Sequence, residues 1–434
     1  MSEVVATAQQ GLTGKYHPYP EYKDSGVEWL GEVPSHWGVL PCRAGVTHLV
    51  AKNTDGKEDN YLSLMANIGI VLYEDKGDVG NKKPDDLTKC KIVRKGNLVI
   101  NSMNYAIGSY GMSPYDGICS PVYIILDANT DVVEQRYALR LFENKPFQKH
   151  LAILGNGILE HRAAIGWDDI KGQYIPFPSL PEQHTIAAFL DYETARIDRL
   201  ITQQQRLIEL LKEKRQAVIS HAVTKGLNPD VPMKDSGVEW LGQVPEHWSV
   251  VKLSYVLSLK SGDGITSNEI EPEGTYPVYG GNGLRGYCEQ FNCNGTYALI
   301  GRQGALCGNV NVADGKFFAS EHAVVVYPRI QFDVRFLSEF LRFMDLGQYS
   351  VSAAQPGISV ERINMLSIAV PPIEEQSLIG QRISQVELQI ERLVVKAEAG
   401  VLLLKERRTA LISAAVTGKI DLRGWTQPAE EVAA

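Results

Sequence analysis

The segment KDSGVEWLGEVPSHW (Lys23–Trp37) recurs almost unchanged as KDSGVEWLGQVPEHW (Lys234–Trp248). Thirteen of the fifteen positions are identical, and each copy holds two tryptophans and a proline. Neither chance nor a biased composition produces such agreement between segments that lie 211 residues apart. The chain therefore contains an internal duplication.

A second repeated pair follows in the same order. LKEKRQAVISHAVT (Leu211–Thr224) matches LKERRTALISAAVT (Leu404–Thr417). The regions between the repeats, Gly38–Leu180 and Ser249–Ile373, differ in length and share little local sequence. The pattern predicts one duplicated scaffold, with pseudo-twofold symmetry, that presents two dissimilar domains.

The second repeat belongs to long predicted helices. Neither Gly nor Pro interrupts residues 182–221, and apolar residues follow steps of four and three in both copies, as in a coiled-coil seam. Ser179 and Glu182 predict a capping box at the start, and Gly226 with Pro229 predicts the end. We expect the two helices to pair antiparallel, the alternative being that each joins a coiled coil with another chain. The residues predicted to pack the pair are Ile186, Leu190, Ile197, Leu200, Leu207, Leu211, Val218, Ile379, Ile383, Val386, Ile390, Leu393, Leu404 and Leu411.

Both intervening regions are typical of mixed α/β domains. Val122–Leu126 and Ala323–Tyr327 have the pattern of buried strands, and residues 134–150 and 334–349 that of one short amphipathic helix each. The expected fold class is α+β, with two α/β domains separated by two long antiparallel coiled-coil helices. The expected divisions are a disordered tail (1–16), a first domain with its conserved segment (17–180), a central helix (181–228), a second domain (229–373), a distal helix (374–425) and a tail (426–434).

Length and charge set broad limits. The chain has 434 residues, too many for one ordinary core, and a net charge of −8. This charge argues mildly against nucleic acid, but a local basic face would not show in the sum. Since no run of 18 apolar residues and no signal peptide occur, we expect a cytoplasmic protein with reduced thiols and no membrane segment.

Motifs for catalysis are missing from the sequence. It contains no P-loop, no dinucleotide-binding glycine motif that opens a strand-to-helix unit, and no H-E-x-x-H. Cys288, Cys293 and Cys307 lack the second close pair of a zinc site, so plain thiols are the favoured interpretation. We therefore expect no catalytic residues and no metal in this chain.

Polar side chains do gather on turns near the predicted strand ends. Asn and Gln pair with adenine edges and Arg with guanine edges, while Gly lets the backbone approach phosphate. The alternative for each position is a structural role, which is common for Asn in turns. The candidate DNA-contacting residues are Lys82, Lys83, Asn101, Ser102, Asn104, Tyr105, Asn282, Arg285, Arg302 and Gln303.

The repeats, together with YPVYGGNGLRGY (276–287) and ALIGRQGALCGNV (298–310), give a family resemblance. The chain resembles the specificity subunit (HsdS) of type I restriction–modification systems over nearly its whole length, from about Tyr16 to Trp425.

This resemblance implies a non-catalytic subunit whose two target-recognition domains each read one half of a split sequence in double-stranded DNA. The helices would dock two methyltransferase (modification) subunits and set the spacer between the half-sites. S-adenosylmethionine would be bound by those subunits, and ATP and Mg²⁺ by separate motor–nuclease (restriction) subunits. Two other classes remain as alternatives, a self-contained DNA nuclease or methyltransferase and a coiled-coil interaction scaffold without a DNA role.

Overall fold

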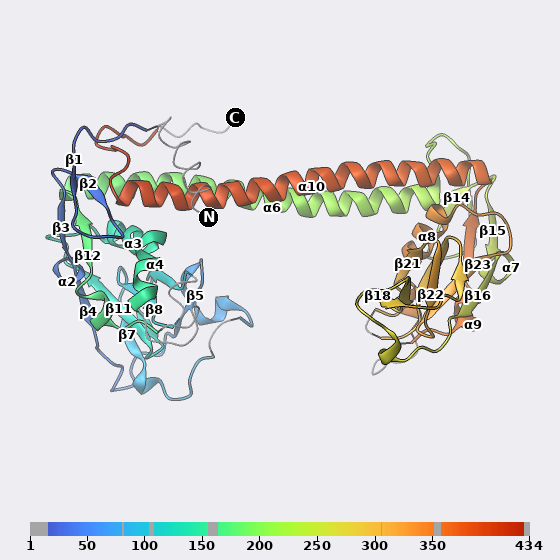
Figure 1. Ribbon diagram of the computed structural model, residues 1–434, viewed down its shortest axis with the longest axis horizontal. Coiled ribbons are helices and arrows are strands. Elements are labelled where there is room, and N and C mark those ends of the chain that lie inside the picture. Colours follow the sequence, from blue (N-terminus) through green and yellow to red (C-terminus); the bar gives the residue numbers. More distant parts are fainter. Residues whose placement is uncertain are drawn as a thin grey trace. The chain divides into compact units, whose positions relative to one another are not determined.

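The computed structural model describes residues 16–79, 82–103, 108–154, 164–304, 306–350 and 357–428. The chain divides into two compact units (Figure 1). Unit 1 comprises residues up to Gln204 together with those from Ala399 onward, and unit 2 comprises Gln205–Glu398. The boundary therefore runs through both long helices, and each unit contains part of each helix.

Unit 1 is built on an antiparallel sheet with the strand order β4-β11-β8-β9. Successive residues of β11 face opposite sides, because side chains alternate along a strand. Ile124 and Leu126 enter the main core, whereas Tyr123 and Ile125 enter a second, smaller core. Both faces of the sheet are thus buried. The strands are β4 (Val46–Leu49), β8 (Leu98–Asn101), β9 (Tyr110–Met112) and β11 (Tyr123–Ala128).

Helices and strand pairs cover this sheet. Helices α3 and α4 contribute Tyr137 and Phe147 to the main core, and the β5-β6 pair contributes Leu62 and Ile70 to the smaller one. The other elements of the unit are β1 (Tyr22–Asp24), β2 (Glu32–Pro34), β3 (Gly38–Pro41), α2 (Cys42–Gly45), β5 (Leu62–Met65), β6 (Gly69–Leu72), η1 (Tyr73–Lys76), η2 (Leu87–Lys89), β7 (Lys91–Val93), β10 (Gly117–Cys119), α3 (Gln135–Glu143), α4 (Lys145–Leu154), α5 (Trp167–Ile170) and β12 (Tyr174–Phe177).

Unit 2 repeats the same sheet order with unrelated residues. Its antiparallel sheet is β16-β23-β20-β21, which corresponds strand by strand to the sheet of unit 1. A second sheet, β18-β17-β22-β19, contains a parallel pair, β17 with β22. The duplication thus extends into the dissimilar domains, and the second sheet distinguishes unit 2. Its strands are β16 (Leu257–Ser261), β17 (Tyr276–Gly280), β18 (Gly283–Cys288), β19 (Cys293–Asn294), β20 (Tyr297–Gly301), β21 (Val310–Ala313), β22 (Lys316–Ala319) and β23 (Ala323–Pro328).

The remaining elements of unit 2 connect this domain to the long helices. They are β13 (Met233–Asp235), β14 (Gln243–Pro245), β15 (Ser249–Lys252), α7 (Leu253–Val256), η4 (Ser267–Glu269), α8 (Val334–Phe343), η5 (Leu346–Tyr349), α9 (Val360–Asn364) and β24 (Ser367–Val370). The buried strands predicted at 122–126 and 323–327 are confirmed as β11 and β23.

The short helices expected in the two domains are each interrupted. The first divides into α3 and α4 at Asn144, and Pro146 is the second residue of α4. Proline has no backbone N–H and restricts the residue before it, so a continuous helix is unfavourable there. The second divides into α8 and η5 at Asp345, which adopts a left-handed conformation with φ 45°.

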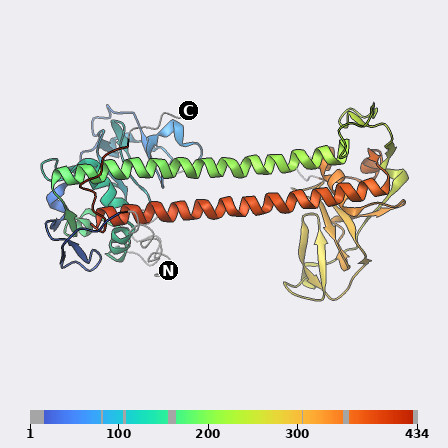
Figure 2. The same cartoon turned by 90° about the horizontal axis from the view of Figure 1, so that it is seen from above.

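The long helices α6 (Leu180–Lys225) and α10 (Ile373–Val416) pack against each other, as predicted. In unit 1, Ile186 and Leu190 of α6 share a core with Leu411 of α10. In unit 2, Leu211 shares a core with Val386 and Ile390. The start of one helix meets the end of the other in both units, so the pairing is antiparallel (Figures 1 and 2).

Three residues predicted for the seam point away from it. Leu200, Leu207 and Leu393 are 39%, 43% and 49% exposed, whereas the neighbouring Ile201 and Val394 pack into the cores. A strict alternation of four and three has a period of 3.5 residues, but a straight helix has 3.6. The contact stripe therefore drifts by one position midway along each helix.

Glycines end both helices. Gly226 has φ 77° and its N–H bonds to the carbonyl of Ala222, which confirms the predicted end of α6. The distal helix was predicted too long, because α10 ends at Val416 and does not continue toward 425. Gly418, at φ 71°, and Lys419 donate to the last free carbonyls in a Schellman motif. Within the described parts of the chain, no helix combines the length and apolarity that a membrane span requires.

Candidate nucleic-acid interface

The duplicated segments form the same contact in both units. Trp37 Nε1 donates to Glu182 Oε1 over 3.0 Å, and Trp248 Nε1 donates to Glu375 Oε2 over 3.1 Å. The preceding residue, His36 or His247, lies 3.0 or 2.8 Å from the same carboxylate. We call this contact the Trp–Glu pair. It replaces the predicted capping box, because the carboxylate of Glu182 is engaged by the indole and the imidazole.

The next residue of each long helix, Gln183 or Gln376, is hydrogen-bonded to the neighbouring α/β domain. Gln183 Oε1 accepts from the backbone N–H of Glu134 at 2.9 Å, and Gln376 Oε1 accepts from that of Asp333 at 3.0 Å. Glu134 and Asp333 are the N-caps of α3 and α8. Each domain is therefore fixed to the start of a long helix by a corresponding hydrogen bond, although the domains themselves differ.

Charged contacts also join each domain to its helix. In unit 1, the guanidinium of Arg136 makes two hydrogen bonds with Asp191, at 2.9 and 2.8 Å, and that of Arg140 makes one at 2.6 Å. Burial alone would raise the pKa of the Asp191 carboxyl, but the two guanidinium groups hold it below its usual value. The side chain of Arg140 is 5% exposed and also pairs with Glu143.

Unit 2 holds the opposite charges at the corresponding places. Counted from the N-caps, Glu339 stands where unit 1 has Arg140, and Arg342 stands where it has Glu143. The side chain of Glu339 is 4% exposed and pairs with Arg335 and Arg342. Arg335 also pairs with Glu387 of α10. The two domains thus dock through similar geometry and different charge patterns.

The candidate DNA-contacting residues of unit 2 converge at the ends of strands. Asn282 lies in the β17–β18 turn, and Arg302 with Gln303 follows β20. The turn and the loop touch, since a Cβ added to Gly281 would lie 2.9 Å from the carbonyl oxygen of Gln303. A Cβ on Gly301 would collide with the carbonyl oxygen of Gly281. Glycine at both positions therefore permits the close approach of these two segments.

The four candidate side chains of unit 2 are accessible to solvent to different degrees. Asn282, Arg285 and Gln303 are exposed, and Arg302 is half-buried with its guanidinium 3.1 Å from Ser261 Oγ. We call these four residues the unit 2 turn cluster.

The sequence did not single out three neighbours of the unit 2 turn cluster as candidates. They are Ser261, Asn309, whose amide lies 3.5 Å from Asn282 Oδ1, and His322, whose carbonyl accepts from the backbone N–H of Arg302. For Asn309 and His322 the signal is their position between two strands that the sequence predicts, at 297–300 and 323–327, whereas Ser261 ends a strand that was not predicted, β16.

The candidates of unit 1 have more varied surroundings. Asn101 is 5% exposed, and its Oδ1 accepts from the backbone N–H of Met103, so this side chain closes the turn after β8. Ser102 is half-buried and donates to the carbonyl of Val122. The alternative of a structural role thus applies to Asn101, because a short polar side chain after a strand readily bonds its own backbone.

The lysine pair of unit 1 lies on another loop. Lys82 is exposed, whereas the ammonium of Lys83 donates to the carbonyl of Asp59 at 3.2 Å. No contact among the described residues joins these lysines to Ser102. Asn104 and Tyr105 lie outside the described residues.

The cysteines do not converge. Cys288 and Cys293 are buried in separate small cores, and Cys307 packs against the main core of unit 2. Across the ranges that the structure describes, no group of three or more His, Cys, Asp or Glu side chains is placed to hold a metal ion.

A family model supplies the identification. The model of the type I restriction modification DNA specificity domain matches residues 50–210 and 245–398, most of the chain. The chain therefore belongs to this family, as the sequence resemblance predicted. It is the DNA specificity subunit of a type I restriction–modification system, a non-catalytic component of the restriction enzyme.

Individual relatives agree with this assignment. The chain is 43% identical over 134 residues to the type I restriction enzyme EcoprrI specificity subunit of Escherichia coli, a match that covers 30% of this chain and 33% of that protein. It is 23% identical over 430 residues to the putative type I restriction enzyme MjaX specificity subunit of Methanocaldococcus jannaschii, covering 91% and 96%.

Solved structures share the fold. A chain from work on complex assembly and conformational transition of the type I R-M system aligns with a TM-score of 0.71 at 17% identity, covering 88% of this chain and 98% of that one. The HsdS subunit from Thermoanaerobacter tengcongensis aligns with a TM-score of 0.56 at 17% identity, covering 89% and 98%. At this identity the two alignments establish the architecture alone.

Proposed function

We propose that the two units read the two halves of a split sequence in double-stranded DNA. One observation carries the proposal, the presence of the same Trp–Glu pair and the same Gln bond in two units whose domains differ in sequence. A duplicated scaffold that holds two dissimilar domains is suited to two different half-sites. The domains in this proposal are residues 17–180 and 229–373, and the long helices α6 (Leu180–Lys225) and α10 (Ile373–Val416) follow them.

The unit 2 turn cluster is the proposed reading surface of its domain. Arg285 and Arg302 carry the donor pairs that suit guanine, and Asn282 and Gln303 carry the amides that suit adenine. In unit 1 the proposed contacts are Lys82 and Lys83 to phosphate, and Ser102, Asn104 and Tyr105 near the bases. Asn101 is left out because its side chain is buried in the turn.

The long helices are the proposed docking surface for two methyltransferase subunits. Large apolar side chains are exposed on α10 in each unit, with Leu388 and Val395 in unit 2 and Leu402 and Leu403 in unit 1. Exposed leucines on a helix are typical of surfaces that bind another helix. S-adenosylmethionine would be bound in those subunits and ATP with Mg²⁺ in motor–nuclease subunits, all in the cytoplasm, and the helices would set the spacer between the half-sites.

Sequencing of methylated adenines tests the proposal. The full chain is expressed with its modification subunits in a host without other adenine methyltransferases, and the modified motif is determined. We expect a motif of two specified parts separated by unspecified bases. A single continuous motif, or methylation by the purified chain alone, would contradict the proposal.

A further inference from the structure

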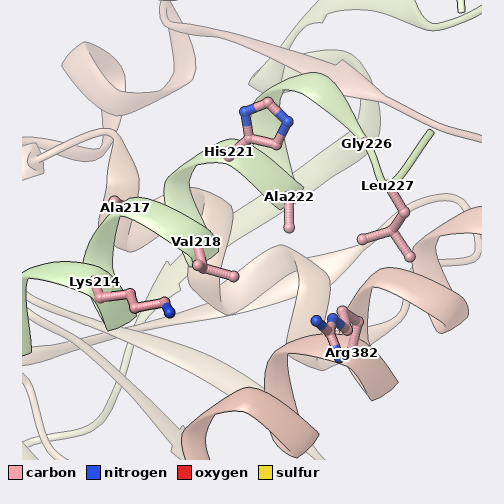
Figure 3. Close-up of a pocket in the computed structure, with 8 residues that line it drawn as sticks. All are labelled: Lys214, Ala217, Val218, His221, Ala222, Gly226, Leu227 and Arg382. Atoms are coloured by element: carbon pink, nitrogen blue, oxygen red, sulfur yellow. The ribbon is translucent and has the colours of Figure 1, made fainter. Parts of the chain in front are cut away.

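Unit 2 contains a pocket where the last turns of α6 face the start of α10 (Figure 3). Its volume is about 340 Å³, at the lower end of the range for ligand pockets. Val218, Ala222 and Leu227 form an apolar wall on one side, and Arg382 lies opposite them on α10. The pocket is therefore apolar within and basic at its edge.

Three cationic or potentially cationic side chains line this pocket, namely Lys214, His221 and Arg382. All three are exposed, and none has a hydrogen-bond or ion-pair partner among the described residues. The nearby carboxylate of Glu375 is directed to Trp248 and His247 and does not line the pocket. Unneutralised cations around an apolar pocket, in a chain with a net charge of −8, favour an anionic ligand.

The duplication shows what fills the corresponding place in unit 1. In the register that aligns Glu182 with Glu375, Arg382 corresponds to Phe189. The ring of Phe189 packs edge-on against Tyr16 and Trp425, each with centroids 5.4 Å apart. The segment that follows α10 thus covers unit 1 with an indole. In unit 2 the chain after α6 passes through Gly226–Pro232 into β13, and Leu227 of this segment lines the pocket in place of an aromatic ring.

We propose that this pocket binds a segment of a partner protein in which an aromatic residue stands beside carboxylates. The aromatic side chain occupies the space that Trp425 fills in unit 1. The carboxylates pair with Arg382 and Lys214, and Arg382 places a positive charge where unit 1 has the ring of Phe189. The inference goes beyond the proposed function, since this pocket is separate from the exposed apolar side chains of α10 proposed to dock the methyltransferase subunits, and its failure leaves the reading of DNA untouched.

Binding of short peptides to the full chain tests the proposal. The probe is fluorescein-labelled acetyl-Asp-Glu-Gly-Trp-Asp-Glu-amide, and fluorescence anisotropy measures its affinity. One control peptide replaces the tryptophan with alanine, and a second replaces all four acids with their amides. We expect each control to bind at least about tenfold more weakly, because it loses either the buried ring or the charge-assisted hydrogen bonds.

Variants of Arg382 locate the site. Arg382→Glu should weaken binding of the acidic peptide at least about tenfold. Arg382→Phe, which introduces the residue type of Phe189, should reduce the preference for the acidic peptide over its amide form, since only Lys214 remains to pair with the carboxylates. Arg392→Glu, at an exposed arginine of α10 outside the pocket, should change the affinity less than about twofold.

Three outcomes would overturn the proposal. They are equal binding of the acidic and amide peptides, equal binding by the wild-type chain and a folded Arg382→Glu variant, and no saturable binding of any peptide. Circular dichroism and thermal unfolding establish that each variant is folded. Lys214→Glu, with the same expected loss, replaces Arg382→Glu if that variant does not fold.

Discussion

Trp37 and Glu182, separated by 145 positions, meet through a 3.0 Å hydrogen bond from the indole to the carboxylate. The indole is fully buried and the Glu182 side chain is 5% exposed. A buried carboxylate is unfavourable unless it is hydrogen-bonded, and Glu182 also accepts from the hydroxyl of Tyr19 at 2.6 Å. Burial, together with this carboxylate, raises the pKa of Tyr19. The first repeated segment is thereby fixed to the start of α6.

Removal of this hydrogen bond should destabilise unit 1. Trp37→Phe keeps an aromatic ring but leaves the buried carboxylate with one donor fewer, at a cost of about 1–3 kcal/mol. Urea unfolding followed by circular dichroism measures the change. Trp248→Phe is the matched control, and since the Glu375 side chain is 26% exposed, water can replace the lost donor and the cost should be smaller. Equal losses in the two variants would contradict this account.

The contact of α3 with α6 should depend on pH. The pKa of Asp191 is lowered in the folded chain, so its ionised form contributes stability above its unfolded pKa of about 4. This contribution is lost as pH falls through the folded value. Asp191→Asn should therefore reduce the free energy of unfolding at pH 7, and the difference from the wild type should shrink progressively below about pH 4.

A matched variant separates this effect from that of a surface ion pair. Asp198→Asn removes the partner of Arg408 at a position that is 53% exposed, where a pair contributes little. At pH 7, Asp198→Asn should reduce the free energy of unfolding by less than Asp191→Asn does. A loss for Asp191→Asn that is the same at pH 7 and pH 3 would contradict the proposed role of the ionised carboxylate.

The scaffold was largely predictable because its signal is repetition. The copies around Trp37 and Trp248 indicated the duplication, and the stripe of apolar residues indicated the helix pair. The inward residues midway along the helices were not predictable, since the choice between Leu200 and Ile201 depends on how far a straight helix drifts from the heptad. The engagement of Glu182 by Trp37 was missed because the two are distant in sequence.

The site was predictable to a smaller extent. Glycines beside Asn282 and Arg302 indicated turns, but only the fold shows that these turns touch at Gly281. Asn101 illustrates the opposite case, because a polar residue after a strand can face solvent or close its own turn. The sequence contains no signal that separates a solvent-facing Asn101 from one that closes its own turn. The orientation of this side chain depends on how the chain leaves β8 and returns to pair with it as β9.

Substitution in the unit 2 turn cluster should alter one half of the modified motif. Arg302→Ala removes a guanidinium suited to guanine, and the loss of one bidentate pair is expected to cost about 1–3 kcal/mol of discrimination. Sequencing of methylated adenines should show one relaxed position in one half-site and an unchanged other half. Arg329→Ala, whose guanidinium bonds the carbonyl of Leu257 within the domain, is the control and should leave the motif unchanged. Relaxation in both halves would contradict independent reading by the two domains.

The reversed charges predict that the two domains are not freely interchangeable. If the domain of unit 2 replaces that of unit 1, the buried Glu339 takes the place of Arg140 and faces Asp191. Two carboxylates at a half-buried contact repel each other, at a cost of a few kcal/mol. We expect the transposed chain to unfold at lower denaturant than the wild type.

A single substitution in α6 should restore the transposed chain. The position of Asp191 corresponds to Ser384 in α10, whose hydroxyl donates to the carbonyl of Gly380 in its own helix. Asp191→Ser therefore removes the carboxylate that would face Glu339 and leaves the residue type that α10 has at this position. In the wild-type chain the same substitution should destabilise, because Arg136 and Arg140 lose their partner. A substitution that stabilises one arrangement and destabilises the other can act only through the docked contact. Denaturant unfolding of the four chains measures this coupling, and equal effects of Asp191→Ser in both arrangements would show that charge does not select the position of each domain.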